Sequence, residues 1–393
     1  MFVYQTSNIA GKPLQQEDYA EAAFSYLRPE FRQELKSFLR GLWKKTAIPK
    51  LENKLTRKIF IRCMLDEIWK DSRFGDCRKN GLDLLNMRVI DVRENRKDDI
   101  KEKSKRISST HLAKSFTKVK QSFTSIADLL ISNWQITNGE CLVTNELIIM
   151  STWYRSNSKP TLEQVGEMSK WMMLSMALKP TTGGPTQKLT KECCDIVRTE
   201  KAWTKVQDKL QLRKLDSSDF GNRENDSSSK PKSNLGAKSM MFHLFKLNLF
   251  RSEAKDIFDS TTISLVNCDF LNVDHFYPQT PLGRISTLKY RRSHLANFVL
   301  MKEWSNKAKG KEWPDVLITK ESVWPKSQTD KDNFRAHCIP LEPTNGAWIK
   351  KPESAIKNHT KFSKQYIPFL AHRSNLMAKR VNKMLDEIAT KGF

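Results

Sequence analysis

Asp274 and His275 are adjacent in the sequence and, together with Asn306, carry the groups that phosphodiester hydrolysis requires. That reaction needs a water nucleophile, a base to deprotonate it, and positive charge beside the anionic transition state. Imidazole is largely neutral near pH 7 and accepts a proton from water, so we assign His275 as general base. The carboxylate of Asp274 and the amide oxygen of Asn306 form a hard oxygen set that suits one Mg²⁺ or Mn²⁺ ion.

Basic side chains surround these three residues and are candidates for binding the phosphates that flank the scissile bond. An isolated Asp-His pair is more often an ordinary hydrogen-bonded pair, so the case for a site depends on the residues around it. Four other histidines, at 243, 294, 337 and 372, fall outside the pattern and are left out of the site. The phosphate-binding candidates are Arg291, Arg292, Lys302, Lys307 and Lys309.

The elements that must position the site are a strand and two helices. Residues 262–276 are rich in β-forming side chains and predict a strand that contains Asp274 and His275. Neighbouring side chains on a strand point to opposite faces, so we expect the carboxylate and the imidazole to approach from different sides. Residues 240–250 are predicted to be helical, and the apolar face of a helix over 369–388 is a candidate to pack on the catalytic core.

The preceding residues predict helices. Apolar residues recur every three or four positions over 20–42, where Pro29 starts a second helix, and again over 162–178. Thr56 is a predicted N-cap. The charged run at 88–106 indicates an exposed helix or connector. We therefore expect a mainly helical α+β chain, with a helical domain over 1–215, a linker over 216–236 and a catalytic domain over 237–393.

Charge indicates a polyanionic partner. The chain carries 68 Lys and Arg against 44 Asp and Glu, a formal charge of +24, of which residues 237–393 contribute +11 and residues 1–236 the remaining +13. Basic charge in both halves favours nucleic acid over a single basic tail, although solvated helix faces are the plain alternative. The seven cysteines include no Cys-x-x-Cys pair and are expected to be reduced. Neither a signal peptide nor a membrane span is predicted, so we expect a soluble cytoplasmic protein.

The order and spacing of these residues resemble the HNH, or ββα-metal, nuclease motif. The match is Asp-His-x-x-Pro at 274–278, then Asn297 after eighteen residues, then Asn-Lys-x-x-Gly at 306–310 after eight more. The resemblance implies that Asp274 and Asn306 bind the metal, that His275 is the base, and that Asn297 pins the hairpin loop and orients the base. It also implies a small ββα-metal core surrounded by helices.

The wider sequence resembles the C-terminal part of GmrSD-like and SspE-like modification-dependent restriction enzymes, which are bacterial defence proteins. The likeness includes Asn8-Ile-Ala-Gly-Lys-Pro-Leu-Gln-Gln-Glu-Asp near the start and Phe369-Leu-Ala-His-Arg-Ser-Asn-Leu near the end, where Arg373 recurs. The Asp-Gly-Gln-Gln-Arg signature of those enzymes' amino-terminal domain is absent from these 393 residues. The resemblance therefore implies an effector that works with a separate sensor or nucleotide-hydrolysing protein.

The leading hypothesis is an HNH endonuclease that cuts DNA as the effector of a restriction or anti-phage system. One alternative is a subunit that binds nucleic acid without catalysis. The other is an HNH-type ribonuclease, because the motif does not distinguish the sugar; the lack of a ribonucleoprotein-type aromatic signature ranks it lower.

Overall fold

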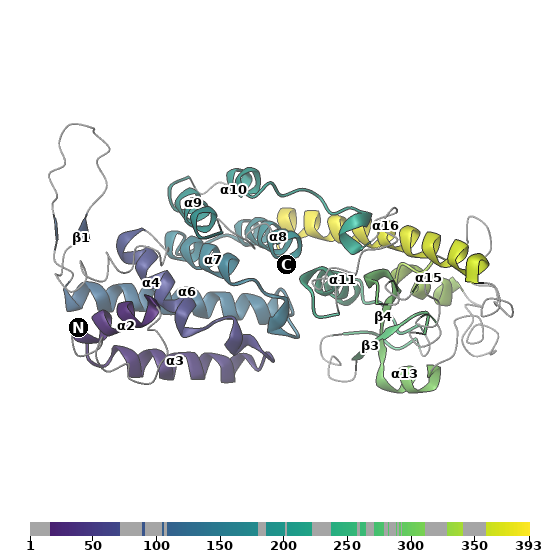
Figure 1. The fold of residues 1–393 in the computed structure, drawn as a ribbon, viewed down its shortest axis with the longest axis horizontal. Helices are drawn as coiled ribbons and strands as arrows, with labels where there is room; N and C mark the ends of the chain where they lie inside the picture. The colour runs from purple at the N-terminus through teal and green to yellow at the C-terminus, as the bar shows by residue number, and fades with distance from the viewer. Residues whose placement is uncertain are drawn as a thin grey trace. The chain divides into compact units, whose positions relative to one another are not determined.

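The chain, drawn in Figure 1 from a computed structural model, divides into two units between Leu212 and Arg213. Each unit has its own buried apolar residues. The boundary lies three residues before the expected end of the helical domain. The residues described are 16–70, 89–90, 104–105, 108–179, 186–200, 203–221, 237–257, 260–264, 271–278, 282, 288, 291, 293–310, 328–340 and 359–393.

The first unit is helical, and its helices begin where the sequence offers caps. The hydroxyl of Thr56 accepts a hydrogen bond from the N–H of Ile59 at 3.3 Å, as predicted for an N-cap. Thr161 and Gln164 form a reciprocal capping box at the next predicted start. The elements are α2 Gln16–Leu27, α3 Phe31–Thr46, η1 Leu51–Asn53, α4 Arg57–Trp69, β1 Val89–Ile90, β2 Ser104–Lys105, α6 Ser109–Ser132, η2 Gly139–Cys141, α7 Thr144–Ser156, α8 Leu162–Leu178, α9 Thr186–Thr199 and α10 Trp203–Lys209.

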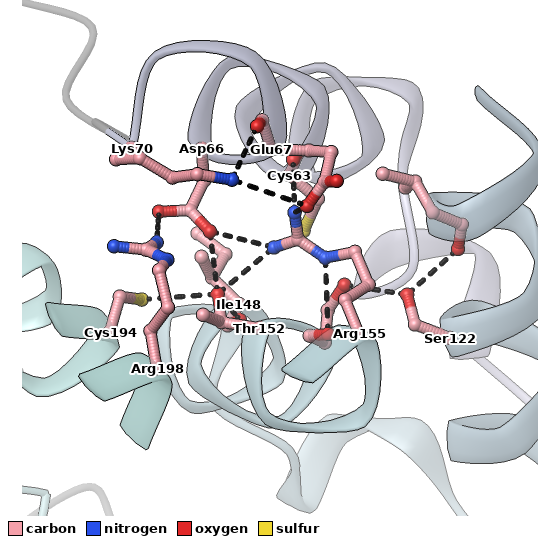
Figure 2. Close-up of polar contacts among 12 residues, drawn as sticks. Cys63, Asp66, Glu67, Lys70, Ser122, Ile148, Thr152, Arg155, Cys194 and Arg198 are labelled. Atoms are coloured by element: carbon pink, nitrogen blue, oxygen red, sulfur yellow. Dashed lines mark hydrogen bonds and ion pairs between the residues drawn. The ribbon is translucent and has the colours of Figure 1, made fainter. Parts of the chain in front are cut away.

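A buried ion-pair network joins three of these helices (Figure 2). Asp66 of α4 is fully buried, and its two carboxylate oxygens accept from Arg155 of α7 at 2.7 Å and Arg198 of α9 at 2.6 Å. Thr152 donates a third hydrogen bond to Asp66 at 2.8 Å. Burial raises the pKa of Asp66, but the two guanidinium groups outweigh it and hold the pKa below its usual value. The carboxylate therefore stays charged at the centre of the unit.

Two segments differ from the sequence-based expectation. The described ends of the charged run, β1 and β2, pair as antiparallel strands, whereas an exposed helix or connector was predicted; the residues between them lie outside the description. The first residues of the predicted linker, 216–221, instead include a capped turn, η3 Ser217–Phe220, in the second unit. Phe220 is fully buried there, and Asp216 before it is the N-cap of the turn. Residues 222–236 lie outside the description.

The second unit places a small strand pair among helices. α11 Met240–Arg251 confirms the helix predicted over 240–250, and α16 His359–Lys391 contains the predicted closing helix. Of the strand predicted over 262–276, residues 271–275 form β3 Leu271–His275. The prediction is wrong for residues 262–264, which form only an isolated bridge between Thr262 and Lys255, and for Phe276, and residues 265–270 lie outside the description. The remaining elements are η5 Leu295–Asn297, β4 Phe298–Lys302, α13 Glu303–Lys309 and α15 Gln328–Ala336.

The prediction of a mainly helical chain with a small strand component is confirmed. The five cysteines of the described residues are buried and form no disulfide with one another. Within the same residues, no helix combines the length and the apolar character needed to cross a bilayer.

Replacing Asp66 with asparagine should lower the free energy of unfolding by about 3–5 kcal/mol, because Arg155 and Arg198 would keep buried charges without their shared carboxylate. The matched control is Asp128→Asn, which removes an exposed pair with Lys45 and should cost at most about 1 kcal/mol. Urea unfolding followed by circular dichroism measures both. Equal losses in the two variants would contradict the central role of Asp66.

Candidate active site

The site residues lie on a hairpin followed by a helix. β3 and β4 pair antiparallel, with Asp274 opposite Val299 and His275 opposite Phe298. α13 follows β4 directly and packs against both strands (Figure 1). Strand, strand and helix therefore occur in the order expected of a ββα core. The motif positions 274, 275, 297 and 306 all lie on these elements or on the turn η5 that starts β4.

Asp274 and His275 converge, although alternation along a strand predicts opposite faces. Nδ1 of His275 lies 3.8 Å from Oδ1 of Asp274, beyond hydrogen-bond distance. The two side chains are 24% and 19% exposed, so both remain reachable from solvent. His275 is the last residue of β3.

The ring of His275 is held on one side by an aromatic neighbour. It packs edge-on against Phe298 with the ring centroids 4.9 Å apart. Its Nε2 atom is buried and has no hydrogen-bond partner among the described residues. The nitrogen on the side of Asp274 is therefore Nδ1, and this is the atom that a water molecule beside the carboxylate would meet.

Lys309 forms a buried ion pair with Asp274. Its Nζ atom lies 2.7 Å from Oδ2 of Asp274, and its side chain is only 1% exposed. Burial raises the pKa of Asp274, but the neighbouring His275 ring and the Lys309 ammonium more than offset this and lower the pKa to about 2. Asp274 is thus an anion at neutral pH. The structure places Lys309 inside the site, whereas the sequence placed it among the residues that contact flanking phosphates.

Asn297 ties the loop after β3 to the start of β4. It is fully buried, its amide oxygen accepts from the N–H of Tyr277 at 2.8 Å, and its amide nitrogen donates to the carbonyl of Tyr277 at 3.0 Å. Its own carbonyl accepts from the N–H of Phe276 at 2.6 Å. These bonds fix the two residues that directly follow His275. Asn297 therefore sits where a residue that pins the hairpin loop must sit.

Arg373 of α16 holds Asn297 in place from the other side. This guanidinium is fully buried and donates to the carbonyls of Ala296 at 2.6 Å and Phe298 at 2.7 Å, the two neighbours of Asn297. It also reaches the carbonyl of His337 at 3.2 Å. Burial lowers its pKa to about 10, so it remains charged at neutral pH. Only the family resemblance, and no local pattern, drew attention to this residue in the sequence.

Asp256 is a positioning residue that sequence analysis missed. It is fully buried, accepts from the N–H of Lys302 at 2.7 Å and from the hydroxyl of Ser305 at 3.2 Å, and so holds the start of α13. Forty-six residues separate it from Lys302, so no short-range spacing signals the contact. Asp256 therefore fixes where α13 begins and, through the helix, where Asn306 lies.

The other predicted residues occupy varied positions. Asn306 is half-buried on α13, one turn before Lys309, and its carbonyl accepts from the N–H of Gly310 at 3.0 Å. Lys307 is 74% exposed and pairs with Glu303 at 2.6 Å. Arg291 and Lys302 are half-buried, and Arg292 lies outside the described residues.

The two candidate ligands are oxygen donors of the kind that hard divalent ions prefer. Asp274 offers an ionised carboxylate and Asn306 a neutral oxygen on the adjoining helix, and the Lys309 ammonium already marks the carboxylate as a place where positive charge is stabilised. No cluster of three or more His, Cys, Asp or Glu side chains able to hold a metal occurs in the described part of the chain, and the candidate set depends on the asparagine amide.

Comparison with protein-family models, with curated proteins and with solved structures found no match to this chain.

Replacing Arg373 with methionine should lower the free energy of unfolding by about 3 kcal/mol or more, because the buried carbonyls of Ala296 and Phe298 would lose their charged donor. The matched control on the same helix is Arg380→Met, which removes one longer bond to the carbonyl of Ala336 at 3.4 Å and should cost about 1 kcal/mol or less. Thermal or urea unfolding compares the two. A cost for Arg373→Met no larger than for Arg380→Met would contradict its role.

Stability should fall as the pH drops from about 6.5 to 4, because burial lowers the pKa of His337 to about 4. The folded pKa lies below the unfolded one, so the contribution is complete above about pH 6.5 and is lost on acidification. At pH 4.5 His337→Gln should recover about 2 kcal/mol of the acid-induced loss. The exposed His111→Gln control should recover none, and equal behaviour of the two variants would refute the assignment.

Proposed function

We propose that this chain is a metal-dependent HNH endonuclease that hydrolyses phosphodiester bonds of DNA. The observation that carries the proposal is the hairpin and helix formed by β3, β4 and α13. This unit brings Asp274 and His275 side by side, fixes the loop that follows them through the hydrogen bonds of Asn297, and carries Asn306 on the adjoining helix. An ordinary surface ion pair would not need a buried asparagine that fixes the loop after the Asp-His pair.

In the proposed mechanism, His275 takes a proton from the attacking water. Its Nδ1 atom lies on the Asp274 side of the ring, and the opposite nitrogen is shielded from solvent. Asp274 and Asn306 would hold one Mg²⁺ or Mn²⁺ ion. That ion, when bound, supplies positive charge beside the phosphate oxygens and the leaving oxygen. Phe298 and Asn297 keep the imidazole oriented by packing and by fixing the loop that follows it.

DNA is the proposed substrate because the chain is basic in both halves, which favours a polyanionic partner. Lys307 is well placed for a flanking phosphate, since its exposed pair with Glu303 is weak and easily exchanged. The same charge would also suit RNA. Matched duplex DNA and single-stranded RNA of one sequence distinguish the two substrates in the same assay.

One observation favours a second candidate function, a subunit that binds nucleic acid without cutting it. The Asp274 carboxylate already has a buried cationic partner in Lys309. A site permanently closed in this way would keep the fold and lose the chemistry.

The family resemblance further suggests that the chain acts as the effector of a restriction or anti-phage system with a separate sensor or nucleotide-hydrolysing protein. Full regulated activity of the purified chain alone would refute that partnership.

Cleavage should require both divalent metal and the Asp-His pair. Wild type with Mg²⁺ or Mn²⁺ should nick or linearise plasmid DNA, and His275→Ala and Asp274→Ala should lose at least about 100-fold in rate, because each removes a group that acts at the reacting phosphate. EDTA should abolish cleavage. His372→Ala, which changes a histidine outside the motif, is the matched control.

The assay is run with and without candidate partner proteins, and DNA binding is measured in parallel by electrophoretic mobility shift. Binding retained by all variants with cleavage by none, under every condition, would replace the nuclease with the binding subunit.

A further inference from the structure

Lys309 occupies the carboxylate that the proposed metal ion needs. Its ammonium contacts Oδ2 of Asp274 at 2.7 Å, and the lysine side chain is almost fully buried. A buried ammonium that is paired with a carboxylate competes strongly with any other cation for that carboxylate. The incoming cation must break the ion pair, and the displaced ammonium must then be solvated elsewhere. The described structure is therefore a closed form of the site.

The position of Lys309 on its helix makes exchange mechanically simple. Lys309 is the last residue of α13, and Gly310 follows it with a positive φ of 54°, a conformation that favours glycine. The Gly310 N–H bonds to the carbonyl of Asn306, which anchors the helix end independently of the lysine side chain. The flexible four-carbon stem of Lys309 can thus leave Asp274 while Asn306 stays in place.

We propose that Lys309 is a resident counterion of Asp274, and that a divalent metal binds by displacing it. The inference rests on the proposed function and adds its regulation. The exchange keeps metal affinity low in the free protein, since the incoming ion must break the buried pair. A nearby phosphate can accept the displaced ammonium, so nucleic acid and metal promote each other's binding. The site then loads fully only when substrate is present.

The first test measures Mn²⁺ affinity of the full-length metal-free chain without nucleic acid, by electron paramagnetic resonance of the free ion. Lys309→Met should bind Mn²⁺ at least about 10-fold more tightly than wild type, because the half-buried carboxylate is left without a counterion. Lys307→Met, two residues away on the same helix and exposed, should match wild type. Asp274→Asn should remove binding from both the wild-type and the Lys309→Met backgrounds.

Circular dichroism checks that each variant is folded, and Lys309→Gln carries the same expectation if the methionine variant is not. Affinity that is unchanged or weaker in the folded Lys309 variant, while Asp274→Asn still abolishes binding, overturns the counterion and leaves the nuclease proposal standing. Mn²⁺ binding that Asp274→Asn does not affect overturns the proposed metal site itself, and the counterion with it.

The second test measures coupling to substrate in a His275→Ala background, which prevents cleavage. A short duplex should raise the Mn²⁺ affinity of this protein several-fold. The same duplex should raise it clearly less when Lys309→Met is added, because no ammonium remains to be transferred. Equal enhancement in the two proteins would refute the exchange.

Discussion

The guanidinium of Arg373 is the interaction on which the second unit depends. It is a buried cation whose hydrogen bonds in the structure go to main-chain carbonyls on either side of Asn297 and at His337. A charge in that position satisfies several acceptors at once, which a neutral side chain cannot do. From it a continuous series of contacts leads outward. Arg373 fixes Asn297, Asn297 fixes Tyr277, and Tyr277 lies two residues beyond His275.

α13 shows how a short helix is made rigid enough to carry a functional residue. Seven residues are too few for a helix to be stable by itself. Asp256 accepts from the N–H of Lys302, just before the helix, and from the hydroxyl of Ser305 in its first turn. At the other end the N–H of Gly310 donates to the carbonyl of Asn306. Neither contact involves the side chain of Lys309, so both can hold α13 in place whether or not Lys309 contacts Asp274.

Local patterns predicted most of the helices and the residues of the motif. The Thr56 cap, the helix over 162–178 and a strand that contains Asp274 and His275 follow from spacing and side-chain type. The contact between Asp256 and α13, and the pairing of Lys309 with Asp274, do not, because they depend on tertiary packing between residues 46 and 35 positions apart. The polar stretch at 216–221 was predicted to belong to a linker. Asp216 and Asp219 instead form the capping box of a turn that buries Phe220, and composition alone does not distinguish a capped turn from a linker.

The Asp66 network also constrains how the first unit can be made. Its carboxylate is paired with an arginine 89 residues later and with another 132 residues later. During synthesis the chain therefore carries Asp66 well before either partner exists, and α4 cannot be buried in that interval without stranding a charge. Arg155 of α7 supplies the first guanidinium, and Arg198 of α9 supplies the second. The first unit should consequently close late, since its central carboxylate has both partners only after α9 has been synthesised.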